Sequence, residues 1–182
     1  MRFAYADPPY LGCCAKYGHR HEAPYGCWND LETHRLLIRN LRDGYPDGWA
    51  LSLGSNNEED MLHLCREEIG RNKVRNGGWL KPFAIYKPGV NPAYTWEPVI
   101  FIGGRKRDRT KPTVPDWHVE NITLKKGLTG AKPPNFPAWI LGLLGVDFSV
   151  GDTIDDLFPG THGLTNTWAV AAELQPAALE LT

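Results

Sequence analysis

Hydrophobic positions follow two different periods along the first part of this chain. Residues 2–6 and 49–53 are short, nearly continuous apolar runs bounded by proline, glycine or aspartate, which is typical of buried strands. Between and after them, apolar side chains recur every three to four residues over 31–41 and 61–69. That spacing predicts two amphipathic helices, the first of them capped by Asp30.

The rest of the chain continues the alternation of strands and helices. The further predicted elements are strands over 79–86 and 95–102, a helix over 136–144, a strand over 153–158, a helix over about 164–174 and a last strand over 177–181. Strands that alternate with helices indicate an α/β fold with a mainly parallel, doubly wound sheet in a single domain.

Composition narrows the class of protein. The chain has 182 residues, 42% of them hydrophobic and 23% charged, with a net charge of -1, which favours one folded domain over a disordered chain. Its longest apolar stretch, residues 136–146, is broken by proline and glycine and is too short to span a membrane. The N-terminus reaches Asp7 without a signal segment, and the adjacent Cys13 and Cys14 do not easily bridge each other. We therefore expect a reduced, cytoplasmic protein, for example in a bacterial or phage-infected cell.

Basic residues gather in one segment. From residue 105 to 132 there are eight basic and three acidic side chains, a net charge of +5, which leaves -6 for the remainder. Such a strip is compatible with a polyanion that docks on one face, and the alternative is a solvated loop. The candidates for nucleic-acid contacts are Arg105, Lys106, Arg107, Arg109, Lys111, Lys125 and Lys126.

The strongest chemical motif is Asp7-Pro8-Pro9-Tyr10, directly after the first predicted strand. The two prolines exclude helix and strand, so a rigid turn lies where ligands bind in open α/β sheets. The Asp7 carboxylate and the Pro8 carbonyl can each accept a hydrogen bond from one N–H of an exocyclic base amine. Tyr10 offers a flat face to a base that has left its stack. The alternative is a proline-rich turn in which Asp7 caps a helix.

These four residues resemble the catalytic motif of the S-adenosylmethionine-dependent DNA methyltransferases that make N6-methyladenine or N4-methylcytosine. Residues 156–163, Asp-Leu-Phe-Pro-Gly-Thr-His-Gly, resemble the cofactor loop of that family, Asp-Pro-Phe-x-Gly-Ser-Gly. Glu180 resembles the acid that bonds the cofactor ribose, and Lys132-Pro133 resembles a segment that flanks the cofactor. The cofactor-binding residues implied by the resemblance are Asp156, Phe158, Gly160, Thr161, Gly163, Glu180 and Lys132.

The order of the motifs resembles the circularly permuted arrangement of this family, because the catalytic motif precedes the cofactor loop. Between them, residues 96–101 resemble a family strand with the pattern His/Trp-Glu-x-Ile-x-Phe, and residues 87–92 resemble its Lys-Pro-Asn loop. The resemblance implies a catalytic half over 1–104, a short basic target-recognition loop over 105–130 and a cofactor-binding half over 131–182. This would be a minimal, phage-like form with a Rossmann-like fold.

The implied function is transfer of a methyl group from S-adenosylmethionine to the exocyclic amine of a flipped DNA base, with adenine N6 favoured over cytosine N4. DNA and S-adenosylmethionine are the implied partners, and the short recognition loop leaves room for a homodimer. Two alternatives stay open. One is a non-catalytic nucleic-acid-binding relative whose cofactor loop is impaired by His162, and the other is a methyltransferase for RNA or protein amines.

Cysteine and histidine cluster near the N-terminus, which raises the question of a zinc site. The cluster contains Cys13, Cys14, His19, His21, Cys27 and His34. Its spacing matches no standard zinc site, so we expect no metal and instead a loop over the base pocket.

The seven tryptophans divide by context. We expect four of them to pack in the core or between helices: Trp49, Trp79, Trp139 and Trp168. The other three lie where a base could stack on them: Trp28, Trp96 and Trp117.

Overall fold

The computed structural model describes residues 1–13, 28–84, 88–123, 131–160 and 163–174. Within these ranges six strands form one sheet in the order β5-β3-β4-β2-β1-β6. The strands are β1 (Arg2–Ala6), β2 (Gly48–Ser52), β3 (Val74–Leu80), β4 (Trp96–Gly103), β5 (Trp117–Val119) and β6 (Thr153–Asp156). The α-helices are α1 (Leu31–Gly44), α2 (Glu58–Ile69), α3 (Phe136–Leu144) and α4 (Gly163–Leu174). No helix in this described part is long and apolar enough to cross a bilayer.

The sheet is mainly parallel, as the sequence predicts. β1 pairs in parallel with both β2 and β6, and β3 pairs in parallel with β5. β4 alone among the described strands runs in the opposite direction, antiparallel to β2 and β3. The α/β prediction is therefore confirmed, with one reversed strand that local patterning did not distinguish from the others.

One strand prediction needs correction, and one strand was missed. The strand expected over 79–86 is β3, and it begins and ends earlier. Its centre holds Gly77 and Gly78, which weaken the apolar pattern and leave little room for a side chain. A Cβ on Gly77 would lie 2.1 Å from the Asp116 carbonyl oxygen, and one on Gly78 would lie 3.0 Å from the Trp96 ring. β5 was not predicted at all, because three residues inside a basic segment carry no period, and the strand expected over 177–181 lies outside the described residues.

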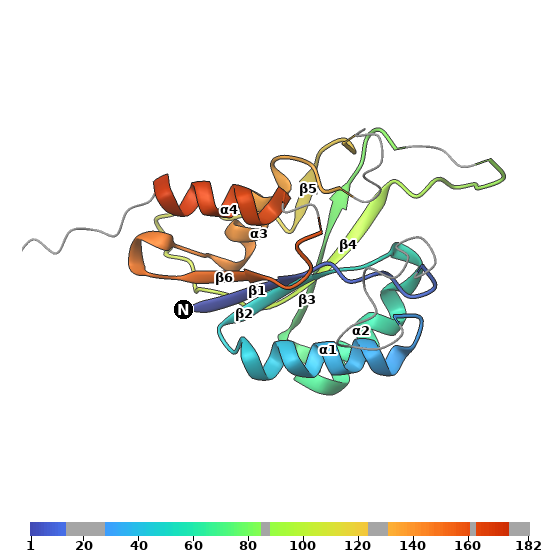
Figure 1. Ribbon diagram of the computed structural model, residues 1–182, viewed down its shortest axis with the longest axis horizontal. Coiled ribbons are helices and arrows are strands. Elements are labelled where there is room, and N and C mark those ends of the chain that lie inside the picture. The colour runs from blue at the N-terminus through green and yellow to red at the C-terminus, as the bar shows by residue number, and fades with distance from the viewer. Residues whose placement is uncertain (14–27, 85–87, 124–130, 161–162, 175–182) are drawn as a thin grey trace, which may run out of the picture.

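Helices cover both faces of the sheet. Figure 1 shows α1 and α2 on one face and α3 and α4 on the other. On the first face Leu37, Ile38 and Leu41 of α1 are fully buried in one hydrophobic cluster. On the other face the ring of Tyr5 in β1 meets Trp168 of α4 edge-on, with centroids 6.0 Å apart. Burial of each large apolar side chain contributes roughly 1.5–3 kcal/mol, so these two layers fix the positions of the strand ends.

The sheet changes winding direction between β6 and β1. The helix after β1 packs on one face, whereas the helix that follows β6 packs on the other (Figure 1). Tyr5 stands opposite Asp156 in the register of the two strands, and the backbone N–H of Leu157 donates to the Tyr5 carbonyl at 3.0 Å. In open α/β sheets, ligands bind outside the carboxyl ends of strands at such a reversal. Asp7 and Asp156 both lie at this edge.

Candidate active site

The Asp7-Pro8-Pro9-Tyr10 turn leaves β1 at the edge where the winding reverses. Pro8 and Pro9 are buried, and the N–H of Cys13 closes the turn by donating to the Tyr10 carbonyl at 2.8 Å. The Tyr10 hydroxyl lies 3.2 Å from Asp7 Oδ1 as a hydrogen-bond donor. The motif thus has the rigid turn geometry that its prolines predict.

Lys132 joins this turn from 125 residues away in the sequence. Its Nζ donates to Asp7 Oδ2 at 2.7 Å and to the Tyr10 hydroxyl at 3.2 Å, and its side chain is only 3% exposed. The sequence singled out Lys132 as a cofactor neighbour, and the structure brings it into direct contact with the candidate catalytic motif. A buried ammonium of this kind orients the carboxylate that it contacts.

Two more charged residues, Glu97 and Lys81, join Asp7, Tyr10 and Lys132 in one hydrogen-bonded cluster. Glu97, near the start of β4, accepts a hydrogen bond from the Tyr10 hydroxyl at 3.0 Å. Lys81, just after β3, donates to the other Glu97 oxygen at 2.9 Å, while Lys132 Nζ lies 3.6 Å from Glu97. The sequence motif places Glu97 in a family-like strand but gives it no role, and no motif marks Lys81. The only local signal for the two residues is a charge at the end of an apolar strand run.

The cluster balances its charges internally. Burial raises the pKa of Tyr10 well above its ordinary value, and the neighbouring Asp7 and Glu97 charges add to this effect. Tyr10 therefore stays a neutral phenol at physiological pH. For Glu97, burial acts to raise the pKa, but the ammonium groups of Lys132 and Lys81 outweigh it, so that the pKa is lowered. Glu97 is therefore ionised, and two carboxylates face two ammonium groups.

A second turn follows β6 at the same edge. Asp156 accepts hydrogen bonds from the Phe158 N–H at 3.2 Å and from the Thr165 hydroxyl of α4 at 3.1 Å. Gly160 has a left-handed φ of +48°, which glycine adopts without the strain that a side chain brings. α4 then begins at Gly163. An acid, a turn and a helix N-terminus are thus held together, the arrangement that suits a ligand with a charged end.

Some predicted cofactor residues have other surroundings. The Phe158 ring meets Trp28 edge-on, with ring centroids 5.2 Å apart. Thr161 and Glu180 lie outside the described residues, as does His162.

The predicted basic residues do not form one uniform surface. Arg105 binds both oxygens of Asp152 at 2.7 Å, beside the N-terminal amine, at the amino ends of β1 and β6. Arg107 donates to the carbonyls of Pro112 and Gly142. Three further members are exposed: Lys106, Arg109 and Lys111. Lys125 and Lys126 lie outside the described residues.

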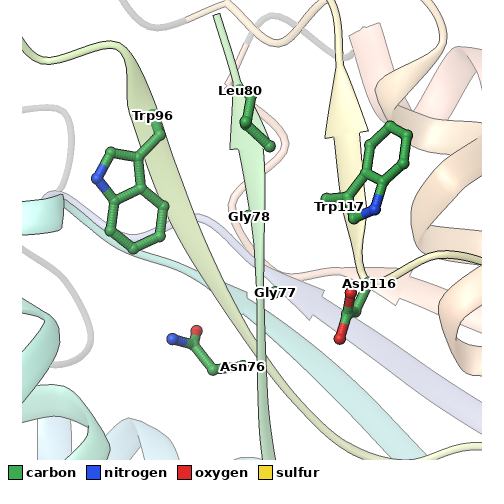
Figure 2. A pocket seen from close by; sticks show the side chains of 7 residues that line it. All are labelled: Asn76, Gly77, Gly78, Leu80, Trp96, Asp116 and Trp117. Carbon is green, nitrogen blue, oxygen red and sulfur yellow. The ribbon is translucent and has the colours of Figure 1, made fainter.

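A shallow groove of about 310 Å³ lies over β3, β4 and β5, on the side of the sheet away from β6 (Figure 2). Trp96 and Trp117 stand on either side of β3, with Gly77 and Gly78 between them (Figure 2). These two tryptophans are 37% and 54% exposed. Because Trp96 and Glu97 are neighbours in a strand, their side chains point to opposite faces, so this groove does not open onto the Glu97 carboxylate.

The remaining tryptophans are buried. Trp49, Trp79, Trp139 and Trp168 are at most 6% exposed, which confirms their predicted core positions. Trp28, considered as a stacking surface, is only 2% exposed and packs against His34 and Phe158. That expectation was wrong, because a loop tryptophan here fills the core beside α1.

Of the cysteine and histidine cluster, Cys13 and His34 are described. His34 Nε2 lies 2.9 Å from the Trp28 carbonyl in a buried hydrogen bond. The other four, Cys14, His19, His21 and Cys27, lie outside the described residues. Among the residues that are described, no three potential ligands of the His, Cys, Asp or Glu type group around a common point.

Solved structures that are similar to this chain at low sequence identity include the following two. The M1.HpyAVI–SAM complex has a TM-score of 0.56 and 12% identity, over 97% of this chain and 79% of that one. TTHA0409 from Thermus thermophilus, named as a DNA modification methylase, has a TM-score of 0.57 and 14% identity, over 92% of this chain and 75% of that one. No protein-family model matches the sequence, and no curated protein does. The similarity establishes a shared Rossmann-like α/β fold.

Proposed function

We propose that this chain is a DNA methyltransferase that moves a methyl group from S-adenosylmethionine to the exocyclic amine of a flipped base. The observation that carries the proposal is the Asp7-Pro8-Pro9-Tyr10 turn beside the Asp156 turn, both at the edge where the sheet reverses its winding. The fold shared with a SAM complex and with a named DNA modification methylase supports it. Adenine N6 is the preferred acceptor, on the resemblance of the motif.

The Asp156 turn is the proposed cofactor site. Gly160 needs no side chain at its left-handed φ, and Asp156 already organises the backbone between β6 and α4. The residues of this turn therefore fit the carboxylate end of S-adenosylmethionine, with Gly163 at the helix start and Thr161 as a further ligand. Glu180 is the proposed ligand of the cofactor ribose hydroxyls. When bound, the cofactor supplies an electrophilic methyl group.

Asp7 and Tyr10 are the proposed catalytic residues. The Asp7 carboxylate accepts a hydrogen bond from one N–H of the base amine, and the Pro8 carbonyl accepts a hydrogen bond from the other. The nitrogen lone pair is thereby directed away from the ring. Lys132 holds Asp7 Oδ2 at 2.7 Å and thereby fixes the carboxylate before the base enters. The Tyr10 ring would support the face of the base. As the bond between the amine nitrogen and the methyl carbon forms, the bond between that carbon and the cofactor sulfur would break and leave S-adenosylhomocysteine, and the proton lost by the nitrogen would pass to the Asp7 carboxylate that accepts its hydrogen bond.

The proposed organisation is a single permuted domain. The catalytic half over 1–104 precedes a short basic loop over 105–130 and the cofactor-binding half over 131–182. Exposed Lys106, Arg109 and Lys111 are the proposed phosphate contacts within the described part of the loop. A homodimer would provide DNA contacts that so short a loop lacks.

Methylation of DNA and digestion to nucleosides would test the function. Duplex DNA is incubated with the protein and labelled S-adenosylmethionine, and mass spectrometry then separates N6-methyladenine from N4-methylcytosine. RNA and protein substrates are run in parallel, because label in either of them alone would favour that alternative. Binding of S-adenosylhomocysteine, measured by calorimetry, distinguishes an enzyme from a non-catalytic relative, which would bind DNA but not this ligand.

A further inference from the structure

One phenolic proton lies between two carboxylates in the active-site cluster. The Tyr10 hydroxyl is 3.0 Å from Glu97 Oε2 and 3.2 Å from Asp7 Oδ1. A tyrosine hydroxyl has a single hydrogen, so it cannot donate fully to both oxygens. Whichever carboxylate takes that hydrogen has one acceptor position fewer for a ligand.

We propose that Glu97 is a positioning residue that draws the Tyr10 proton away from Asp7, and that Lys81 anchors Glu97 for this purpose. Asp7 Oδ1 then keeps its acceptor capacity for the amine of the target base. This inference rests on the proposed methyl transfer, because only there does Asp7 need a free lone pair toward an amine.

The geometry around Glu97 favours this division. Its oxygen Oε2 has the shorter contact with the Tyr10 hydroxyl, and Oε1 is held by Lys81 Nζ at 2.9 Å. Both oxygens are thus oriented by named partners, so the carboxylate cannot turn away from Tyr10 without losing a charge-assisted hydrogen bond. Lys132, 3.6 Å from Glu97, already serves Asp7 Oδ2 at 2.7 Å.

Lys81 is itself held in place. The residue is 8% exposed, its backbone N–H donates to the Thr95 carbonyl at 2.7 Å, and its ammonium lies 5.4 Å from the Trp79 ring centroid. A buried ammonium needs a carboxylate partner, and Glu97 is the partner that it contacts. Lys81 and Glu97 therefore behave as one unit, and Asp7 receives its effect through Tyr10.

A double-mutant cycle with Glu97→Gln and Tyr10→Phe tests this route. The amide introduced by Glu97→Gln accepts less strongly than the native carboxylate. In the otherwise native protein the Tyr10 proton should therefore move to Asp7, and kcat should fall about 30-fold with KM for DNA nearly unchanged. In the Tyr10→Phe background no such proton exists, and the same change should cost only about 3- to 5-fold. An equal loss in both backgrounds would overturn the proposal.

Lys81 provides a matched pair of variants. Lys81→Arg keeps the charge and should retain kcat within about 3-fold, whereas Lys81→Met should lower it about 10-fold, again only when Tyr10 is present. Glu59→Gln, an exposed site on α2, serves as the control for surface charge. Thermal unfolding of each variant checks that the chain is folded. Equal activity of Lys81→Arg and Lys81→Met would contradict the anchoring role.

A second readout does not depend on methyl transfer. Ring-labelled tyrosine reports the ionisation of Tyr10 by NMR in the free protein. The Glu97 charge contributes to the raised pKa of Tyr10, so Glu97→Gln should lower that pKa while Glu59→Gln leaves it unchanged. An unchanged Tyr10 titration overturns the contact with Glu97. If Glu97→Gln gives this shift but the native protein methylates no DNA, the proposed function alone is refuted.

Discussion

Two aspartates mark opposite ends of the same pair of strands, and their surroundings differ. Asp152 precedes β6 and is completely buried; it accepts from the N-terminal amine at 2.8 Å, from Arg105 at 2.7 Å and from the Asp147 N–H at 2.9 Å. Asp7 follows β1, is 22% exposed, and among the described residues accepts from Lys132 and Tyr10. Both acids pair with a cation brought from far along the chain.

Asp152 forms a structural ion pair, whereas Asp7 forms an ion pair that leaves it able to accept a further hydrogen bond. Hydrogen bonds to both Asp152 oxygens leave a ligand little room to compete, so its role is to tie the start of β6 to β1 and to the segment after β4. Asp7 keeps acceptor capacity at an accessible edge, where its two partners orient it without saturating it. A carboxylate that is fixed but not saturated is suited to hold a substrate hydrogen.

Replacing Asp7 should produce the largest effect on function. Asp7→Ala removes the acceptor for the amine, so kcat should fall about 100- to 1,000-fold, the scale of losing a preorganised active-site hydrogen bond. Cofactor binding should change little, since the Asp156 turn is untouched. The melting temperature should fall by a few degrees, because the buried Lys132 ammonium then loses the Asp7 carboxylate, and the Glu97 carboxylate is more distant. Labelled methyl transfer to DNA, together with calorimetry, measures both. Methyl transfer that survives this substitution would remove Asp7 from the site.

Replacing Asp152 should instead lower the stability of the fold and leave catalysis unchanged. Asp152→Ala leaves Arg105 and the N-terminal amine without their shared carboxylate. Loss of one member of a fully buried pair costs about 3–5 kcal/mol; here both cations are partly exposed, so we expect about 2 kcal/mol, or a fall of about 4–8 °C in melting temperature. The kcat of the folded fraction should be retained. Chemical denaturation measures the first quantity, and a stable but inactive variant would erase the distinction between the two acids.

Lowering the pH should reduce the contribution of Asp152 to the stability of the fold. Burial opposes ionisation of Asp152, but hydrogen bonds from the N-terminal amine, Arg105 and the Asp147 N–H outweigh it and lower the pKa. The unfolded chain therefore binds this proton more readily, and the stabilisation is present above the unfolded pKa of about 4 and lost as the pH falls through the folded-state value. The difference in unfolding free energy between the native protein and Asp152→Asn should shrink from pH 6 to pH 3. A constant difference would show that the charge is not responsible.

The Asp7-Pro8-Pro9-Tyr10 turn was predictable because its information is local. An apolar run followed by two prolines specifies a strand and a rigid turn, and the motif at Asp7 needs no distant residue to be noticed. The same holds for α1, whose apolar spacing and Asp30 cap lie within one segment; the Asp30 side chain accepts from the Glu32 N–H at 3.2 Å. The prediction of the mainly parallel sheet followed from these alternating elements.

The cluster around the turn was not predictable in the same way. Tyr10 and Glu97 are 87 residues apart, and their contact depends on the antiparallel placement of β4 and on the shifted bounds of β3. Neither feature has a local pattern. The direction of β4 depends on its pairing with distant strands, and β3 has glycines at 77 and 78 where apolar residues would have marked a strand. Counting charges also could not show that Arg105 is paired with Asp152 whereas Arg109, among the described residues, makes no ion pair.

That difference within the basic segment gives the smallest effect that we expect. Lys106→Ala, Arg109→Ala and Lys111→Ala each remove one exposed cation, so each should weaken DNA binding a few-fold and lower the slope of log affinity against log salt by about 0.9 if it neutralises one phosphate. Arg105→Met should lower the melting temperature and leave that slope unchanged, because its guanidinium already serves Asp152 at the amino end of β6. Titration of labelled duplex DNA at several salt concentrations measures all four. If Arg105 alone changed the slope, Arg105 rather than the three exposed cations would be the residue that contacts phosphate.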